Sequence, residues 1–214
     1  MKKTLLTIII LFLGTFSVSA QLYRYLDTQQ GLSSRRVIAV EKDQKGYMWF
    51  LTQEGVDRYN GKQFTNYTLS DGNRPVLHFP NLSQLHIDNQ DDIWVTGKNG
   101  FIFKYNQMLD KYDLVMNFAD SLKTKRRLPL THTSIDRQNN LWLCTRNAQY
   151  IYRTDTKHVI KLETPIKEEV FYIEQAKGNR YFFGTRENVY VASLKGNRLV
   201  LEPEHTISNI HRVQ

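Results

Sequence analysis

The sequence has one cysteine and, after its first 20 residues, no long apolar run. Because Cys144 has no partner for an internal disulfide, the chain is not a disulfide-stapled domain, and packing alone must hold it together. A membrane-spanning helix needs about 18 consecutive apolar residues, and no window after Ala20 supplies them. An apolar content of 41% and an aromatic content of 12% exclude a disordered or collagen-like chain. We therefore expect a globular protein.

The first 20 residues resemble a secretory signal peptide. Lys2 and Lys3 form a positively charged region, residues 4–18 form an apolar stretch, and Val18-Ser19-Ala20 supplies the small residues that signal peptidase requires. A retained membrane anchor is the alternative, but the apolar run is shorter than the ~20 residues that a spanning helix needs. We therefore expect residues 1–20 to be removed and residues 21–214 to be exported.

The chain carries an excess of positive charge. It has 29 basic and 21 acidic side chains, for a net charge of +8. The basic residues are scattered, and only residues 123–127 form a dense run. Since an exported chain does not meet nucleic acid, we expect no nucleic acid as a partner. An anionic ligand and a solvated surface both remain compatible with this charge.

The tryptophans reveal an internal repeat. Trp49, Trp94 and Trp142 are spaced by 45 and 48 residues, and Phe182 lies 40 residues further on. An aspartate lies six residues before each tryptophan, and the three are Asp43, Asp88 and Asp136. Turn signals such as Asn60-Gly61 separate short aromatic stretches, a pattern typical of antiparallel strands. The first repeat predicts strands at about residues 36–41, 47–51, 56–59 and 63–67.

Four short strands in every ~40 to 45 residues, with an aromatic in the second strand, predict an all-β propeller built from four-stranded antiparallel blades. We expect blades at residues 32–68, 80–118, 128–164 and 168–203, and the first strand of a fifth at 206–214. The repeated aromatics would pack between neighbouring blades. The repeated aspartates would close turns by accepting backbone N–H groups. A calcium site at Asp88, Asp91 and Asp92 is a weaker alternative, because the spacing lacks the distal glutamate of a calcium loop.

The first repeat resembles the two-component regulator propeller repeat. The resemblance rests mainly on Gly31-Leu32-Ser33-Ser34, Tyr47-Met48-Trp49-Phe50 and Arg58-Tyr59-Asn60-Gly61. The later repeats match more loosely, and in the fourth Ala176 and Phe182 stand where the aspartate and tryptophan are expected. The resemblance covers about residues 22–204.

This resemblance implies a non-catalytic ligand-sensing module from the periplasmic region of a Bacteroidetes hybrid two-component system. Such sensors combine two seven-bladed propellers with a membrane helix and a histidine kinase, and they typically detect oligosaccharides released from glycans. The implied partners are a neutral or anionic oligosaccharide, the remaining blades, the kinase region and a second copy of the sensor. Seven blades need about 315 residues. We therefore expect the chain to be the amino-terminal piece of a larger sensor anchored in the inner membrane.

The sequence predicts no catalytic, cofactor or metal site. It has no helix-borne His-Glu-x-x-His, no Gly-rich phosphate loop and no Gly-x-Ser-x-Gly. Cys144 falls in a predicted strand, where burial is expected. One alternative is a propeller enzyme of the streptogramin-lyase type, for which His132 is the histidine that we place near a first strand. A scaffold without a small ligand is the other alternative.

Ligand contacts are expected on two sets of loops: those that lead into the first strand of each blade and those between the second and third strands. In a propeller both sets gather on one face. Their polar side chains can bind sugar hydroxyls, and arginine would also bind a uronate or sulfate. Polar turns are also common without any ligand. The candidates are Arg35, Arg36, Gln53, Glu54, Asn81, Lys98, Asn99, Arg146, Asn147, Arg186 and Glu187, and Glu168 and Glu169 lie in the same set of loops.

Overall fold

A computed structural model of the chain describes residues 24–70, 75–77, 82–124, 128–203 and 207–208. The predicted signal peptide, Asn81 and residues 209–214 lie outside this part. The described residues form antiparallel sheets in chain order, and the predicted all-β fold class is confirmed. No helix within these ranges is long and apolar enough to span a bilayer.

Four main sheets account for most of the chain. Sheet 1 contains β1 (Val37–Lys42), β2 (Met48–Thr52), β3 (Val56–Tyr59) and β4 (Phe64–Tyr67). Sheet 2 contains β7 (Leu82–Ile87), β8 (Ile93–Gly97), β9 (Phe101–Asn106) and β10 (Lys111–Asn117). Sheet 3 contains β11 (His132–Ile135), β12 (Leu141–Thr145), β13 (Ala148–Arg153) and β14 (His158–Lys161). Sheet 4 contains β15 (Tyr172–Gln175), β16 (Arg180–Gly184), β17 (Asn188–Lys195) and β18 (Arg198–Leu201).

Short elements connect or extend these sheets. They are η1 (Thr28–Gln30), the pair β5 (Leu69–Ser70) and β6 (Pro75–Leu77), α2 (Phe118–Ser121) and β19 (Ile207–Ser208). The sequence predicts the first strand of a fifth blade at residues 206–214. Of these the structure describes Ile207–Ser208, which form β19 and pair with β17 of sheet 4.

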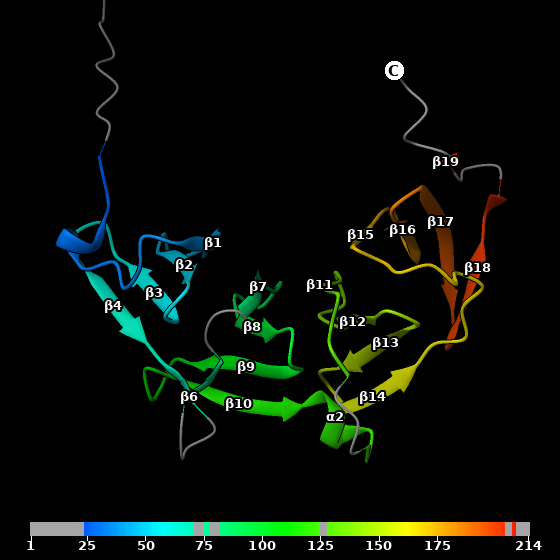
Figure 1. Ribbon diagram of the computed structural model, residues 1–214, viewed down its shortest axis with the longest axis horizontal. Coiled ribbons are helices and arrows are strands. Elements are labelled where there is room, and N and C mark those ends of the chain that lie inside the picture. Colours follow the sequence, from blue (N-terminus) through cyan, green and yellow to red (C-terminus); the bar gives the residue numbers. More distant parts are fainter. Residues whose placement is uncertain (1–23, 71–74, 78–81, 125–127, 204–206, 209–214) are drawn as a thin grey trace, which may run out of the picture.

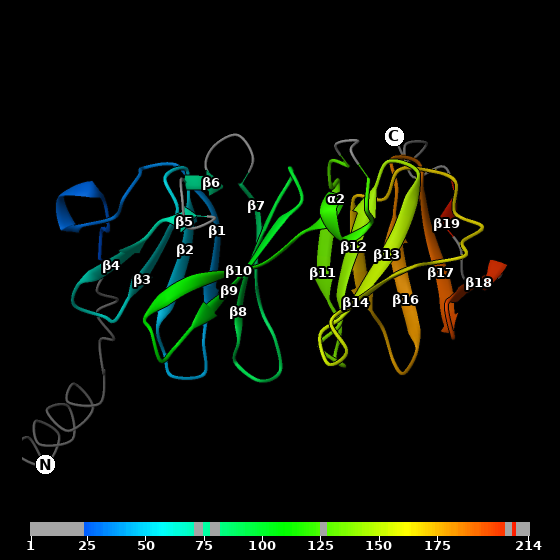
Figure 2. The same ribbon diagram turned by 90° about the horizontal axis from the view of Figure 1, so that it is seen from below.

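The four sheets stand side by side in an arc (Figure 1). The first strands, β1, β7, β11 and β15, line the concave side of the arc, and each contacts the next along the series. The fourth strands lie on the convex side. Figure 2 shows that the turns between first and second strands lie along one edge of the arc, whereas the loops leading into the first strands lie along the opposite edge.

The tryptophans pack forward, against the following sheet. Trp49 belongs to a core that includes Ile93 and Val95 of sheet 2. Trp94 packs in the same way with residues of sheet 3, and the ring of Trp142 lies 4.5 Å from that of Tyr181 in sheet 4. The three tryptophans are 1%, 3% and 0% exposed, as expected for anchors between sheets.

Phe182 occupies the corresponding position but is not buried. The N–H of Ala176 bonds the carbonyl of Arg180, just as that of Asp43 bonds Tyr47, and this common pairing places Phe182 in the register of Trp49. Phe182 is nevertheless 40% exposed, while Tyr181 and Phe183 beside it face sheet 3 and are buried. A side chain in this register points toward a following sheet, and no described sheet follows sheet 4. The expected burial at Phe182 is therefore not observed.

The repeated aspartates close turns, as predicted, and also hold the tryptophans. One oxygen of Asp88 accepts from the N–H groups of Gln90 and Asp92, at 2.9 and 3.0 Å. Its other oxygen accepts from the indole N–H of Trp94 at 2.9 Å. Equivalent indole bonds, of 2.8 and 3.0 Å, join Trp49 to Asp43 and Trp142 to Asp136. Each carboxylate therefore fixes both the turn and the aromatic anchor of its own sheet.

The segment before β1 is fastened to sheet 1 through Asp57. Gly31 ends η1 with a φ of 105°, which glycine adopts without strain. Leu32 is then buried, and both the N–H and the hydroxyl of Ser33 donate to Asp57, at 2.8 and 2.7 Å. Asn66 donates to the other oxygen of Asp57 at 2.7 Å. These contacts explain why Gly31, Leu32 and Ser33 occur together.

Candidate functional site

A groove of about 510 Å³ lies on the concave side of the arc. Its walls are the first strands, and it therefore collects residues from all four sheets. The polar residues that line it are Glu41, Gln84, His86, His132, Thr133, Ser134, Tyr172 and Glu174. Because neighbouring first strands supply these groups, a ligand in the groove would contact several sheets at once.

A hydrogen-bonded network forms the floor of the groove and joins three sheets. Thr133 donates its hydroxyl to Gln84 at 2.8 Å, and its oxygen lies 2.9 Å from Nε2 of His86. The amide nitrogen of Gln84 lies 3.1 Å from Nδ1 of His132. On the other side of that ring, Nε2 of His132 accepts from the N–H of Ile173 in sheet 4 at 3.2 Å. The network therefore connects β7, β11 and β15.

Burial keeps both histidines neutral. Burial and the neighbouring His132 lower the pKa of His86 to about 3. Burial alone lowers the pKa of His132 to about 4. At neutral pH the two rings therefore act as uncharged hydrogen-bonding groups.

Exposed groups form the rim of the groove. Tyr172 is 53% exposed, its ring centre lies 5.9 Å from that of His132, and its hydroxyl donates to Glu174 at 3.1 Å. On the first sheet, burial raises the pKa of Glu41. An exposed aromatic face beside carboxylates combines an apolar surface with hydrogen-bond acceptors, which suits a polyhydroxylated ligand.

The loops that carry the described candidates lie along the edge of the arc at which the chain enters the first strands (Figure 2), and the groove lies on those strands. Arg35, Arg36, Glu54, Lys98, Arg146, Asn147, Arg186 and Glu187 are exposed, and Gln53 and Asn99 are partly buried. Arg146 forms an ion pair with Glu169 at 3.8 Å. Glu168 accepts from Thr185 and Asn188 at 2.6 and 2.8 Å, so it supports its own loop. The loops follow successive sheets around the arc and do not converge on one point.

The groove residues were mostly missed from the sequence. Gln84, His86 and Tyr172 carry no motif, and each looks like an ordinary strand residue. The available signal is positional, since every first strand of a propeller lies next to the axis. His132 was placed near a first strand, and it begins β11.

The three aspartates of the alternative calcium site have structural roles, and Cys144 is buried. Asp88 is occupied by Trp94 and backbone groups, Asp92 pairs with Lys104 at 2.5 Å, and Asp91 accepts from the N–H of Gln44 at 2.9 Å. Within the described ranges no three His, Cys, Asp or Glu side chains are grouped so that they could hold a metal ion. Cys144 is fully buried in β12, and burial raises the pKa of its thiol.

Comparison with known proteins bears on the fold. No protein-family model matches the sequence, and no curated protein matches it. The extracellular domain of BT3049, named as a hybrid two-component system of B. thetaiotaomicron, superposes with a TM-score of 0.65 at 19% identity, over 84% of this chain and 26% of that one. The four sheets are propeller blades. The extracellular domain of BT4673 from the same organism superposes with a TM-score of 0.60 at 15% identity, over 83% of this chain and 25% of that one.

A propeller enzyme is also similar in fold. Virginiamycin B lyase from Staphylococcus aureus superposes with a TM-score of 0.58 at 12% identity, over 84% of this chain and 58% of that one. This chain spans about a quarter of the length of the extracellular domains of BT3049 and BT4673. At these identities the comparisons establish the propeller fold.

Because His86 and His132 are neutral and lie between blades, we expect acid to weaken the contacts between blades. Both pKa values are lower in the folded protein than the ~6.5 of an unfolded histidine, so the unfolded chain binds more protons as the pH falls below 6.5. The free energy of unfolding should be unaffected above pH 7. By pH 5, protonation of each histidine in the unfolded chain should have lowered it by about 1–2 kcal/mol. Urea unfolding at pH 7.5 and 5.0 measures this loss. In His132→Gln the free energy of unfolding should change less between pH 7.5 and 5.0. An unchanged difference would contradict the lowered pKa of His132.

Proposed function

We propose that the chain is a periplasmic ligand-sensing propeller module of a hybrid two-component regulator and has no catalytic activity of its own. The observation that carries the proposal is the groove on the concave side, which polar groups from all four blades line together with the exposed ring of Tyr172. The likeness of the blades to extracellular domains of BT3049 and BT4673 supports the sensor assignment.

The proposed ligand is an oligosaccharide derived from a glycan. An aromatic ring, carboxylates and an amide within one groove can bind the faces and hydroxyls of sugar units. Arg35 and Arg36, on the adjoining edge, would favour an anionic sugar. The remaining blades, a kinase region and a second copy of the sensor are the proposed partners, through which binding would be transmitted.

A lyase remains a second candidate because virginiamycin B lyase shares the fold and His132 lies in the groove. A general base must reach the proton that it removes. Both nitrogens of His132 already face protein groups, namely the amide of Gln84 and the N–H of Ile173. This arrangement favours a structural role for His132, and hence the sensor.

Saturation-transfer NMR on the full chain tests the proposal, because it detects weak binding. A panel of neutral and uronate-containing oligosaccharides should include at least one that receives saturation from the protein. The Tyr172→Ala variant should lose most of this transfer, since the exposed ring is removed, whereas Lys195→Gln on the outer part of blade 4 should retain it. Failure of every oligosaccharide, or equal transfer in Tyr172→Ala, would refute the groove as the sensing site.

A further inference from the structure

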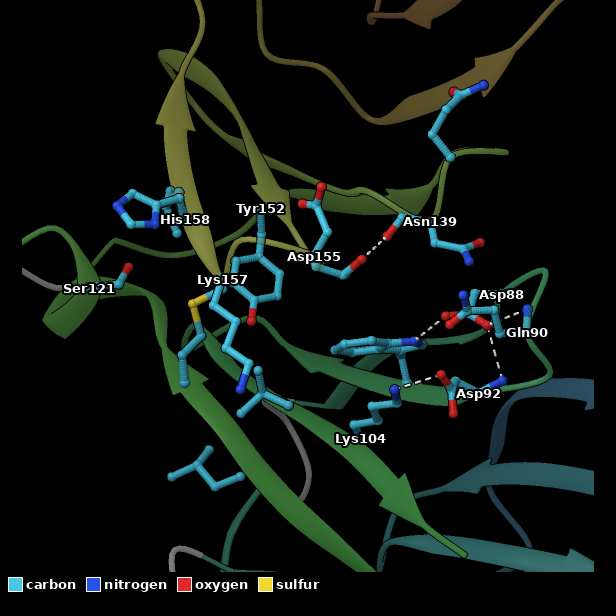
Figure 3. A pocket seen from close by; sticks show the side chains of 17 residues that line it. Asp88, Gln90, Asp92, Lys104, Ser121, Asn139, Tyr152, Asp155, Lys157 and His158 are labelled. Carbon is cyan, nitrogen blue, oxygen red and sulfur yellow. Dashed lines mark hydrogen bonds and ion pairs between the residues drawn. The ribbon is translucent and has the colours of Figure 1, made fainter.

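A second hollow, of about 880 Å³, lies between blades 2 and 3 (Figure 3). The fourth strands that line it, β10 and β14, lie on the convex side of the arc (Figure 1). Strands β9 and β10 form one wall, and β13, β14 and the turn between them form the other. Ligand sites in proteins commonly have volumes of about 300–1,000 Å³. This hollow, the convex cleft, therefore has the size of a small-molecule site.

The corresponding space between blades 1 and 2 is filled. The hollow there measures only about 190 Å³. Tyr67, Tyr105 and Tyr112 pack together around Trp49, with ring centres 5.5 to 5.7 Å apart. The carboxylate of Asp110 joins them, accepting from the hydroxyls of Tyr105 and Tyr67 at 2.5 and 2.7 Å. Arg58 donates to the same oxygen at 3.2 Å.

The two interfaces correspond residue by residue. Tyr105 pairs with Tyr112 across β9 and β10, as Tyr152 pairs with Val159 across β13 and β14. The intervening turns match as well, because each contains a non-glycine residue with a positive φ at the same place, of 48° and 56°. The residues of the first interface that are replaced in the second are Arg58 by Lys104, Tyr67 by Met116, Asp110 by Lys157 and Tyr112 by Val159.

These replacements explain why the convex cleft is open. Compared with the interface between blades 1 and 2, it lacks two phenol rings and one carboxylate. Met116 and Val159 form apolar walls where the rings would be. It keeps one phenol, Tyr152, and gains the ammonium group of Lys157 (Figure 3). Neither group has a hydrogen-bond or ion-pair partner in the part of the chain that the structure describes, so both can bind a ligand.

The other charged groups around the cleft already have partners within the protein. Lys104 pairs with Asp92 at 2.5 Å and lies 5.1 Å from the ring centre of Trp94. Asp88 is bonded to the indole of Trp94, and Asp155 accepts from the N–H of Thr156 at 2.7 Å. Of the charged side chains that line the cleft, Lys157 is therefore the one without a hydrogen-bond or ion-pair partner among the described residues.

We propose that the convex cleft binds a small organic acid with an apolar body of one or two aromatic rings. Its carboxylate takes the role that Asp110 has in the first interface, where a phenol hydroxyl and a cation hold the oxygen. Its apolar body fills the space that Tyr67 and Tyr112 occupy there. This site is separate from the groove and goes beyond the sensing function proposed for it.

Binding of two matched probes to the full chain tests the proposal. The probes are 4-hydroxyphenylacetate and its neutral amide, titrated by calorimetry or by NMR at pH 7. The acid is expected to bind at least about tenfold more tightly than the amide, because only the acid can pair with Lys157. Equal affinity of acid and amide, or no binding of either, would overturn the proposal.

Two variants locate the site. Lys157→Gln removes the charge from an exposed turn and should weaken binding of the acid about tenfold. The triple variant Met116→Tyr, Lys157→Asp, Val159→Tyr rebuilds the first interface in the second and should abolish binding. Lys195→Gln and Tyr172→Ala should bind the acid as the parent does, which separates this result from that of the groove. If Lys157→Gln binds the acid as tightly as the parent does, the proposed location of the site is wrong, whether or not the triple variant folds.

Discussion

Replacing Trp142 by alanine is expected to lower the free energy of unfolding by about 3–5 kcal/mol. The indole is fully buried between blades 3 and 4, with its ring 4.5 Å from that of Tyr181. Removing it leaves a cavity that neighbouring strands cannot close without breaking their ladders. It also takes away the N–H that Asp136 accepts at 3.0 Å, deep in the same core. Urea unfolding followed by circular dichroism measures the loss.

Phe182→Ala is the matched control for this prediction. Phe182 has the register of the tryptophans but is 40% exposed, so its truncation should cost less than about 1 kcal/mol. The contrast tests whether the aromatic anchors act by filling the space between blades. Equal losses at Trp142 and Phe182 would show that the position matters for another reason, such as strand propensity.

Replacing Asp57 by alanine should destabilise the protein by about 2–4 kcal/mol. The residue is fully buried, and its carboxylate accepts from the N–H and hydroxyl of Ser33 and from the amide of Asn66. Alanine would leave these donors without their acceptor. The segment before β1 would also lose its attachment to blade 1. Trypsin should therefore cut faster at Arg35, and thermal unfolding should begin at a lower temperature.

An exposed aspartate provides the comparison. Asp113 accepts from Asn106 at 2.7 Å and pairs with Lys111 at 3.1 Å, but its side chain is 45% exposed. Its replacement by alanine should cost less than about 1 kcal/mol, because solvent replaces its partners. Similar losses for Asp57 and Asp113, or unchanged cleavage at Arg35 in Asp57→Ala, would mean that Ser33 does not depend on the carboxylate.

The blades could be predicted from the sequence because their determinants are local and repeated. The strands of blade 1 begin and end within one residue of their predicted positions. The aspartate six residues before each tryptophan closes a turn, a role that short carboxylates perform within a few residues of chain. The indole bond to the same carboxylate was not predicted, although the constant spacing of six residues is its signature.

The sites could not be predicted because they arise between repeats. The groove joins Gln84, His132 and Ile173, which lie in three different blades and follow no common motif. The convex cleft depends on a difference between two interfaces, namely Asp110 in one and Lys157 in the other. Such a difference becomes visible only when strand pairing fixes which residues correspond. The loop residues chosen for their polarity remain predictions.

The forward packing of the tryptophans gives the chain a direction of assembly during synthesis. Each blade covers the preceding one with the residues beside its own anchor, and it leaves that anchor uncovered until the next ~45 residues have left the ribosome. Domains begin to fold while translation continues. The nascent chain therefore always presents one unfinished aromatic surface at its growing end, and each newly made repeat completes the one made before it.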